Sequence, residues 1–156
     1  LVKALTVDWP VKPILLEAND TEDKRAAFRA ADVALAASGT VSLELAASGT
    51  PMVIAYDMAW LSRMIISRML LVDTVTLVNL VSETRVIPEF IGADCIADDI
   101  AKGLLAVMAD PSKQVGAMGL TMERLGLDGE APGLRAARAV LAGYQASIDD
   151  NQTNRE

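Results

Sequence analysis

The sequence predicts an α/β fold in which helices flank a parallel, Rossmann-like sheet. Short apolar runs at residues 13–17, 33–36 and 52–56 have the length of strands and lack the alternation of a half-exposed strand. Stretches of helical composition at residues 21–30 and 41–48 separate them. Strands and helices that alternate with short connections are typical of a parallel sheet covered by helices. We therefore expect buried strands, with ligands bound beyond their carboxyl ends.

The first predicted strand, residues 13–17, lies between Pro13 and Asn19-Asp20, which are typical of turns. Its sequence, Pro-Ile-Leu-Leu-Glu, suits a strand that is buried on both faces. Residues 1–5 resemble the middle of a helix, and the first residue is Leu rather than Met. We therefore expect the chain to be a fragment of a longer protein.

A turn of small residues, Ser38-Gly39-Thr40, precedes the helix expected at residues 41–48. The start of a helix presents free backbone N–H groups and the positive end of the helix dipole, which favours a phosphate. Glu44 follows one helical turn later, so its carboxylate could accept hydrogen bonds from the ribose of a nucleotide. The alternative is a tight strand-to-helix turn in which Ser38 or Thr40 only caps the helix.

The hexapeptide at residues 35–40 recurs at residues 45–50. Pro51 and the predicted strand at residues 52–56 follow the second copy, so Gly49 is expected to end a helix. We therefore predict neither a second phosphate loop nor an internal repeat.

Residues 58–72 have the length of a helix and are apolar on nearly all sides. One interpretation is a helix buried in a domain interface, with Arg63 and Arg68 reaching outward. The other is contact with a membrane surface or a lipid through Trp60, Met64 and the two arginines.

Residues 76–81 predict a short strand, and Val86 begins a further segment. The last third of the chain predicts three helices, of which the second lies between Asp110-Pro111 and Gly126. Their apolar stripes are Ile100, Leu104, Val107 and Met108; then Val115, Met118, Met122 and Leu125; then Leu134, Ala137, Leu141 and Tyr144. We expect one domain at residues 1–146 and a polar, disordered tail at residues 147–156.

The composition excludes several functional classes. A net charge of −7 argues against a nucleic-acid surface, and no apolar run has transmembrane length. The chain has no histidine, so Ser38 cannot be the nucleophile of a Ser-His-Asp triad within it. The single cysteine, Cys95, permits no internal disulfide and no Cys-based zinc site. We expect Cys95 to lie near the surface of a turn, in a protein of a reducing compartment.

Residues 24–89 resemble the donor-binding half of the lipid-A-disaccharide synthases, which are inverting bacterial glycosyltransferases with two Rossmann-like domains (GT-B). The similar blocks are KRAAFRAADVALAASGTVSLELAASGTPMVIAYDM and TLVNLVSETRVIPEF. The resemblance weakens after Gly92. It implies that the chain is the carboxy-terminal domain of a protein more than twice its length.

The resemblance also implies a reaction. The family transfers 2,3-diacylglucosamine from UDP-2,3-diacylglucosamine to 2,3-diacylglucosamine 1-phosphate, which forms the β-1,6-linked lipid A disaccharide and UDP. The carboxy-terminal domain holds the donor and the amino-terminal domain holds the lipid acceptor. The implied location is cytoplasmic and peripheral to the inner membrane of a Gram-negative bacterium. No cofactor and no metal are expected.

The same resemblance assigns roles to individual residues in the UDP-sugar site. The turn would contact the diphosphate, Glu44 would bind the ribose hydroxyls, and an NL…PE motif would lie by the donor cleft. These residues are Ser38, Gly39, Thr40, Glu44, Asn79 and Glu89. Backbone amides at residues 38–40, with Arg85, are candidates to stabilise the charge of departing UDP. The general base is expected in the missing amino-terminal half, so the fragment alone is predicted to be inactive.

The sequence departs from the family pattern at three places. Many relatives have Pro at the position of Val78 and Gly-Arg-Glu where this chain has Glu83-Thr84-Arg85, and a glutamine is replaced near Gly92. Two other interpretations are a different GT-B transferase or epimerase that uses a UDP-sugar, and a non-catalytic nucleotide-binding module.

Overall fold

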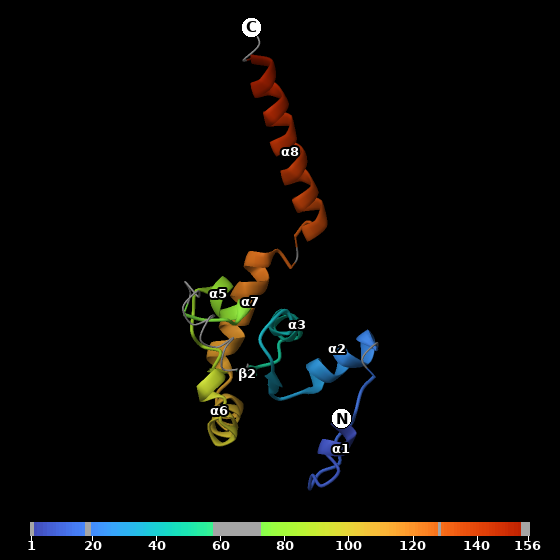
Figure 1. The fold of residues 1–156 in the computed structure, drawn as a ribbon, viewed down its shortest axis with the longest axis vertical. Helices are drawn as coiled ribbons and strands as arrows, with labels where there is room; N and C mark the ends of the chain where they lie inside the picture. The colour runs from blue at the N-terminus through green and yellow to red at the C-terminus, as the bar shows by residue number, and fades with distance from the viewer. Residues whose placement is uncertain (1, 18–19, 58–72, 128, 154–156) are drawn as a thin grey trace.

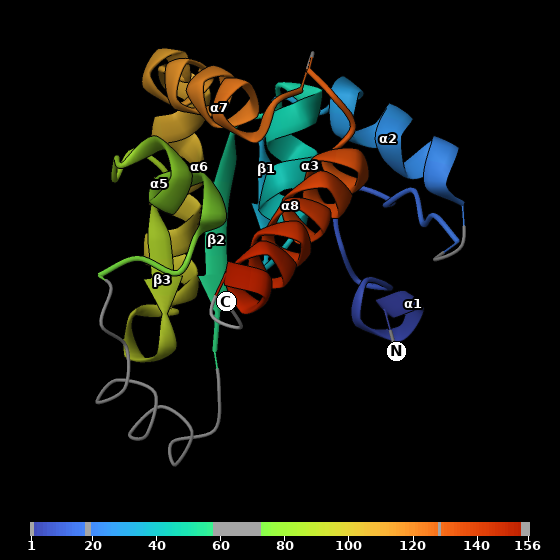
Figure 2. The same ribbon diagram turned by 90° about the horizontal axis from the view of Figure 1, so that it is seen from above.

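A three-stranded parallel sheet lies at the centre of the protein, with strand order β1-β2-β3 (Figure 2). The structure is a computed structural model and describes residues 2–17, 20–57, 73–127 and 129–153. The strands are β1 (Ala34–Ala36), β2 (Met52–Tyr56) and β3 (Glu89–Ile91). Ala34 pairs with Met52, and Ile54 pairs with Glu89. The predicted α/β fold with a parallel sheet is confirmed.

The helices lie before the first strand, in the connections between the strands and in the carboxy-terminal third (Figure 1). They are α1 (Val2–Leu5), α2 (Thr21–Ala30), α3 (Val41–Ser48), α5 (Leu77–Ser82), the 3-10 turn η1 (Gly92–Asp94), α6 (Ala97–Ala109), α7 (Ser112–Leu125) and α8 (Pro132–Thr153). Cys95 follows η1 and is half-buried, as expected for a small residue in a turn.

The main core lies between β2 and the helices α3, α5 and α7. Its fully buried side chains include Leu45 from α3, Val78 from α5, Met118 from α7, and Met52 and Ile54 from β2. Val53 points to the other face of β2, where α6 packs. Gly103 of α6 sits against the Phe90 ring so closely that a Cβ would lie 2.8 Å from it. Leu35 of β1 is 54% exposed, so this strand is not buried on both faces as predicted.

The helix predicted at residues 41–48 is confirmed to the residue as α3. Gly49 ends it in the left-handed conformation, with φ at 72°, and its N–H donates to the Ala46 and Leu45 carbonyls. The strand predicted at residues 52–56 is likewise β2. Pro111 occupies the cap position of α7, and the Asp110 carboxylate one residue earlier accepts a hydrogen bond of 3.1 Å from the Ser112 N–H, the first amide of the helix.

The prediction of a buried strand at residues 13–17 is wrong. These residues are extended but unpaired, and Ile14 is 90% exposed. An apolar run between turn residues shows only that a strand is compatible with the local sequence. Pairing also needs a neighbouring strand, and β1 does not pair with this segment.

The predicted strand at residues 76–81 is also wrong, because the chain forms α5 there. Val78, Asn79 and Ser82 are buried, and their spacing is that of one helical face. A six-residue apolar run fits a strand and a short helix equally well when only its pattern is considered. Contacts from elsewhere in the chain decide between the two.

The face of α7 toward the core is rotated by one residue from the prediction. Val115 is 51% exposed, whereas Gln114 beside it is buried; Met118 and Met122 are buried as expected. A buried glutamine was not expected because polar side chains enter cores only when their hydrogen bonds are satisfied.

Helix α8 extends away from the sheet, and its carboxyl end lies at the far tip of the molecule (Figure 1). It continues to Thr153, where a disordered tail was expected from residue 147. Its predicted apolar residues Leu134, Leu141 and Tyr144 are exposed. No helix in the described part of the chain is long and apolar enough to cross a membrane. The predicted helix at residues 58–72 lies outside the described residues.

Candidate functional site

The turn Ser38-Gly39-Thr40 lies where the sequence places it, between the carboxyl end of β1 and the start of α3. Gly39 has φ at 135°, a backbone conformation that residues with a side chain rarely adopt. The Thr40 side chain makes no capping hydrogen bond. Among the described residues, the amides of Gly39 and Thr40 have no hydrogen-bond partner. These donors are therefore available to an anion in front of the helix.

The side chains beside these amides are already engaged within the protein. The Ser38 hydroxyl donates to the Val75 carbonyl at 3.1 Å. The Ser42 hydroxyl, which is fully buried, donates to the Gly39 carbonyl at 2.9 Å. The interpretation in which Ser38 or Thr40 caps α3 is therefore not what the structure shows. Both serines instead fix the shape of the turn.

Glu44 lies on α3 and faces α2. Its carboxylate is 2.5 Å from the Lys24 ammonium group, which also lies 5.7 Å from the centre of the Phe28 ring. Both charged side chains are about two-fifths exposed. Glu44 borders a groove of about 380 Å³ between the two helices, lined also by Thr21, Arg25, Phe28, Arg29, Ala47 and Ser48. The carboxylate is thus accessible to solvent and pairs with Lys24.

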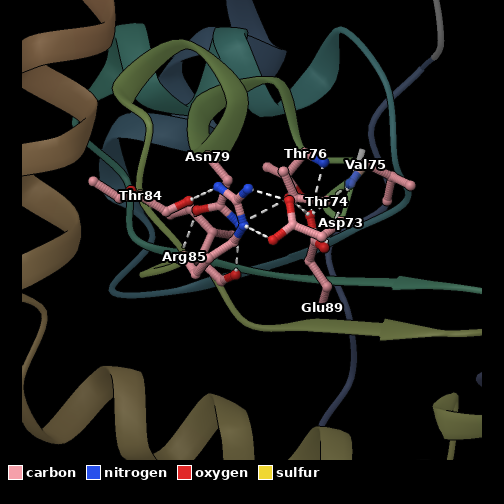
Figure 3. Close-up of polar contacts among 9 residues, drawn as sticks. Asp73, Thr74, Val75, Thr76, Asn79, Thr84, Arg85 and Glu89 are labelled. Carbon is pink, nitrogen blue, oxygen red and sulfur yellow. Dashed lines mark hydrogen bonds and ion pairs between the residues drawn. The ribbon is translucent and has the colours of Figure 1, made fainter. Parts of the chain in front are cut away.

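Asn79 and Glu89 come together around residues 73–76, which we call the bridging segment (Figure 3). The Glu89 carboxylate accepts hydrogen bonds from the Thr74 hydroxyl at 2.5 Å, the Val75 N–H at 3.1 Å and the Thr76 N–H at 2.7 Å. It thereby binds the backbone donors of the two residues immediately before α5. This contact stabilises a helix where the sequence pattern predicts a strand.

The buried side chain of Asn79 fixes the other end of this network. Its amide group donates to the Thr74 hydroxyl at 3.2 Å and to the Ile87 carbonyl at 3.0 Å. Its carbonyl oxygen accepts from the Ile87 N–H at 3.0 Å. Thr74 therefore links Asn79 to Glu89. All of these polar atoms are paired within the protein.

Arg85 lies at the exposed edge of the same network. Its guanidinium group pairs with the Asp73 carboxylate and donates to the Thr84 carbonyl (Figure 3). The hydrogen bond from Arg85 lowers the pKa of the Asp73 carboxyl, and the same contact raises the pKa of Arg85. The arginine therefore holds the first residue of the bridging segment.

The structure thus connects four of the predicted site residues. Ser38 contacts the bridging segment at Val75, Glu89 and Asn79 hold it from the other side, and Arg85 holds its first residue. Glu44 is not part of this network. The bridging segment itself was not predicted, because nothing in the local pattern of residues 73–76 shows that a glutamate from β3 binds their backbone.

The described part of the chain contains no group of three or more Cys, Asp or Glu side chains that could hold a metal ion. Four candidates for lipid contact, Trp60, Arg63, Met64 and Arg68, lie outside the described residues.

A parallel sheet flanked by helices, with a glycine turn that opens a helix beyond its first strand, defines a Rossmann-like α/β domain consistent with a GT-B glycosyltransferase. A family model described as lipid-A-disaccharide synthetase matches residues 12–137. The chain belongs to this family.

Individual relatives agree with the family assignment. The chain is 61% identical over 140 residues to a lipid-A-disaccharide synthase of Ruegeria pomeroyi, covering 86% of the chain and 35% of the relative. It is 43% identical to that of Bradyrhizobium diazoefficiens, with 86% and 34% covered, and 42% identical to that of Paramagnetospirillum magneticum, with 76% and 32% covered. The chain spans about a third of the length of these curated relatives.

Proposed function

We propose that this chain is the donor-binding domain of a lipid-A-disaccharide synthase and that it holds UDP-2,3-diacylglucosamine. The observation that carries the proposal is the pair of unpartnered amides, Gly39 and Thr40, at the start of α3 in a member of this family. Two adjacent N–H donors and the helix dipole suit the diphosphate of a nucleotide sugar. The partly exposed carboxylate of Glu44, on the next turn of α3, suits the ribose hydroxyls.

The complete enzyme would transfer the diacylglucosamine group to 2,3-diacylglucosamine 1-phosphate with inversion. The amides of the turn would stabilise the charge that develops on UDP as the sugar leaves. Arg85 would assist only after release from Asp73, since the two are paired in this structure. The general base would come from the remaining part of the protein, so this chain alone would form no disaccharide. The enzyme would act in the cytoplasm at the surface of the inner membrane.

The donor site can be tested by titrating the chain with UDP in a calorimeter. We expect UDP to bind and the Glu44→Ala variant to bind it about tenfold more weakly, because a hydrogen bond to a charged group contributes about 1.5–3 kcal/mol. Glu22→Ala, which removes a carboxylate from the exposed first turn of α2, is the matched control and should bind like the wild type. A wild-type chain that binds no UDP at millimolar concentration would refute the proposal.

Catalysis by the chain is tested separately. Purified chain mixed with UDP-2,3-diacylglucosamine and 2,3-diacylglucosamine 1-phosphate should release no UDP and form no disaccharide. Turnover by this chain alone would show that the base lies within it.

A further inference from the structure

We infer that Glu89 and Asn79 are positioning residues, which hold the phosphate-binding turn in place through the bridging segment and Ser38 without touching the donor. The inference rests on the proposed function of the turn. It gives these two residues a role different from the donor contact that the family resemblance implies for them.

The first step is that both side chains already bind other parts of the protein, Glu89 mainly through its carboxylate oxygen Oε1, whereas its Oε2 accepts only a longer contact of 3.4 Å from the Val75 N–H. Glu89 accepts three hydrogen bonds from Thr74, Val75 and Thr76. Asn79 uses both its amide group and its carbonyl oxygen on Thr74 and Ile87, and it is 1% exposed. A donor molecule could bind Asn79 only if several buried hydrogen bonds broke first, and it could engage Oε1 of Glu89 only if that oxygen released the bridging segment.

The second step is the contact from the bridging segment to the turn. The Ser38 hydroxyl donates its single hydrogen to the Val75 carbonyl. Phosphate oxygens are acceptors and need a hydrogen, so this hydroxyl cannot donate to a phosphate at the same time. Ser38 therefore holds the turn, and the amides of Gly39 and Thr40 remain as the donors for the anion.

The third step joins these contacts. Glu89 binds the Val75 N–H, and Ser38 binds the carbonyl of the same residue. A shift of Val75 would therefore move Ser38 and the amides that follow it. Pre-positioned donors lose little freedom when an anion binds, so a shifted turn would bind diphosphate less well.

The test measures the affinities of the chain for UDP and for inorganic pyrophosphate. We expect Glu89→Gln to weaken both by the same factor, on the order of tenfold. Removal of a negative charge near an anion would by itself tighten binding, so a weaker affinity indicates positioning. Glu44→Ala should weaken UDP binding and leave pyrophosphate binding unchanged. Glu83→Gln, the same change on an exposed side chain, is the matched control.

A double-mutant cycle tests the route through Ser38. Glu89→Gln should weaken binding much less in a Ser38→Ala background than in the wild type, because the contact through which it acts is then absent. Should Glu89→Gln fail to fold, Thr74→Val removes the link between Glu89 and Asn79 and should give a smaller loss of the same pattern.

The possible results are distinguishable. A loss of UDP binding alone would place Glu89 on the nucleoside, and unchanged affinities or additive effects with Ser38→Ala would remove its positioning role; each overturns the inference. Wild-type chain that binds neither UDP nor pyrophosphate would refute the proposed donor site, and the inference with it.

Discussion

At the scale of single residues, two buried threonines of the bridging segment differ in the hydrogen bonding of their hydroxyl groups. Thr74 and Thr76 are both almost fully buried. The Thr74 hydroxyl donates to Glu89 and accepts from Asn79. The Thr76 hydroxyl has no partner among the described residues. A buried hydroxyl without a hydrogen bond destabilises the folded state, whereas a hydrogen-bonded one stabilises it.

Replacement of each threonine by valine should therefore change the free energy of unfolding differently. Thr74→Val should lower the free energy of unfolding by about 1–3 kcal/mol, because it leaves Glu89 and Asn79 each short of a partner. Thr76→Val keeps its backbone N–H and should change the free energy by less than about 0.5 kcal/mol or raise it. Urea denaturation followed by circular dichroism measures both. Equal losses in the two variants would contradict this account of the network.

Glu83 shows a second residue-scale effect, since it ends α5 with φ at 59°. This left-handed conformation strains every residue with a Cβ and suits glycine. The exposed contact of Glu83 with Arg124, at 3.3 Å, contributes little to stability.

We expect Glu83→Gly to raise the free energy of unfolding by about 0.5–1 kcal/mol through relief of this strain. Lys102→Gly on the exposed face of α6 is the control, and it should lower the free energy by about 1 kcal/mol, as glycine does inside helices. Thermal unfolding of the two variants gives the sign of each change. A less stable Glu83→Gly variant would show that the exposed ion pair outweighs the backbone strain.

At the scale of elements, a side chain of α7 completes the hydrogen bonding of a strand. The buried amide of Gln114 accepts from the Met52 N–H at 2.8 Å and donates to the Met52 carbonyl at 3.0 Å. Pairing of Ile54 with Glu89 places Met52 ahead of the start of β3. There the next donor along the chain would be Pro88, which has no N–H. The Gln114 side chain therefore makes the two hydrogen bonds to Met52 that a further residue of β3 would otherwise make.

Gln114→Leu should lower the free energy of unfolding by about 2–3 kcal/mol, because it leaves two buried backbone groups of Met52 unpaired. The neighbouring exposed side chain supplies the control, and Lys113→Ala should change it by less than about 0.5 kcal/mol. Urea titrations at neutral pH compare the variants. A loss below about 1 kcal/mol would mean that water reaches Met52 when the glutamine is absent.

The elements also show what the sequence could and could not predict. Helix α3 was predicted to the residue because its signals are local: the turn before it and Gly49 after it. The local pattern of residues 76–81 predicts a strand instead of α5 because Glu89, which binds the two amides immediately before this helix, lies on another element. The turn Ser38-Gly39-Thr40 before α3 was likewise predicted from local residues. The bridging segment could not be predicted, because it is held by long-range contacts to Ser38 and Glu89. The spacing of residues in the sequence does not reveal such contacts.

At the scale of the whole molecule, the buried core residues all come from the part of the chain that runs from β1 through α7. The two ends of the chain carry exposed apolar side chains. They include Val2, Leu5, Trp9 and Ile14 before α2, and Leu134, Val140, Leu141 and Tyr144 on α8. Stability of the chain should accordingly depend on the central α/β body. Two carboxylates of this body connect its stability to pH.

The pKa values of Asp73 and Asp110 are both lowered in the folded state, mainly by hydrogen bonds from Arg85 and from Ser112. A lowered folded pKa contributes stability above the ordinary carboxyl range, and this contribution is lost as the pH falls through the folded value. The free energy of unfolding should therefore decrease as the pH falls below about 5.

In Asp73→Asn and in Asp110→Asn, this decrease should be smaller. Arg85→Gln removes the cause at Asp73 while it keeps the carboxyl group, and it should flatten the curve as well. Urea denaturation between neutral and acidic pH provides the comparison. Curves that run parallel to the wild type would show that neither carboxylate is linked to folding.

The glutamine on α7 also limits where β3 can begin. Because its amide occupies both backbone groups of Met52, β3 cannot extend toward the amino end of β2, and its first paired residue is Glu89 opposite Ile54. A slip of β3 by two residues would carry the Glu89 carboxylate about 6.6 Å along the strand, beyond hydrogen-bond reach of the bridging segment. The alignment of the turn Ser38-Gly39-Thr40 thus depends on a residue of a different helix, 62 positions from the strand residue that it binds.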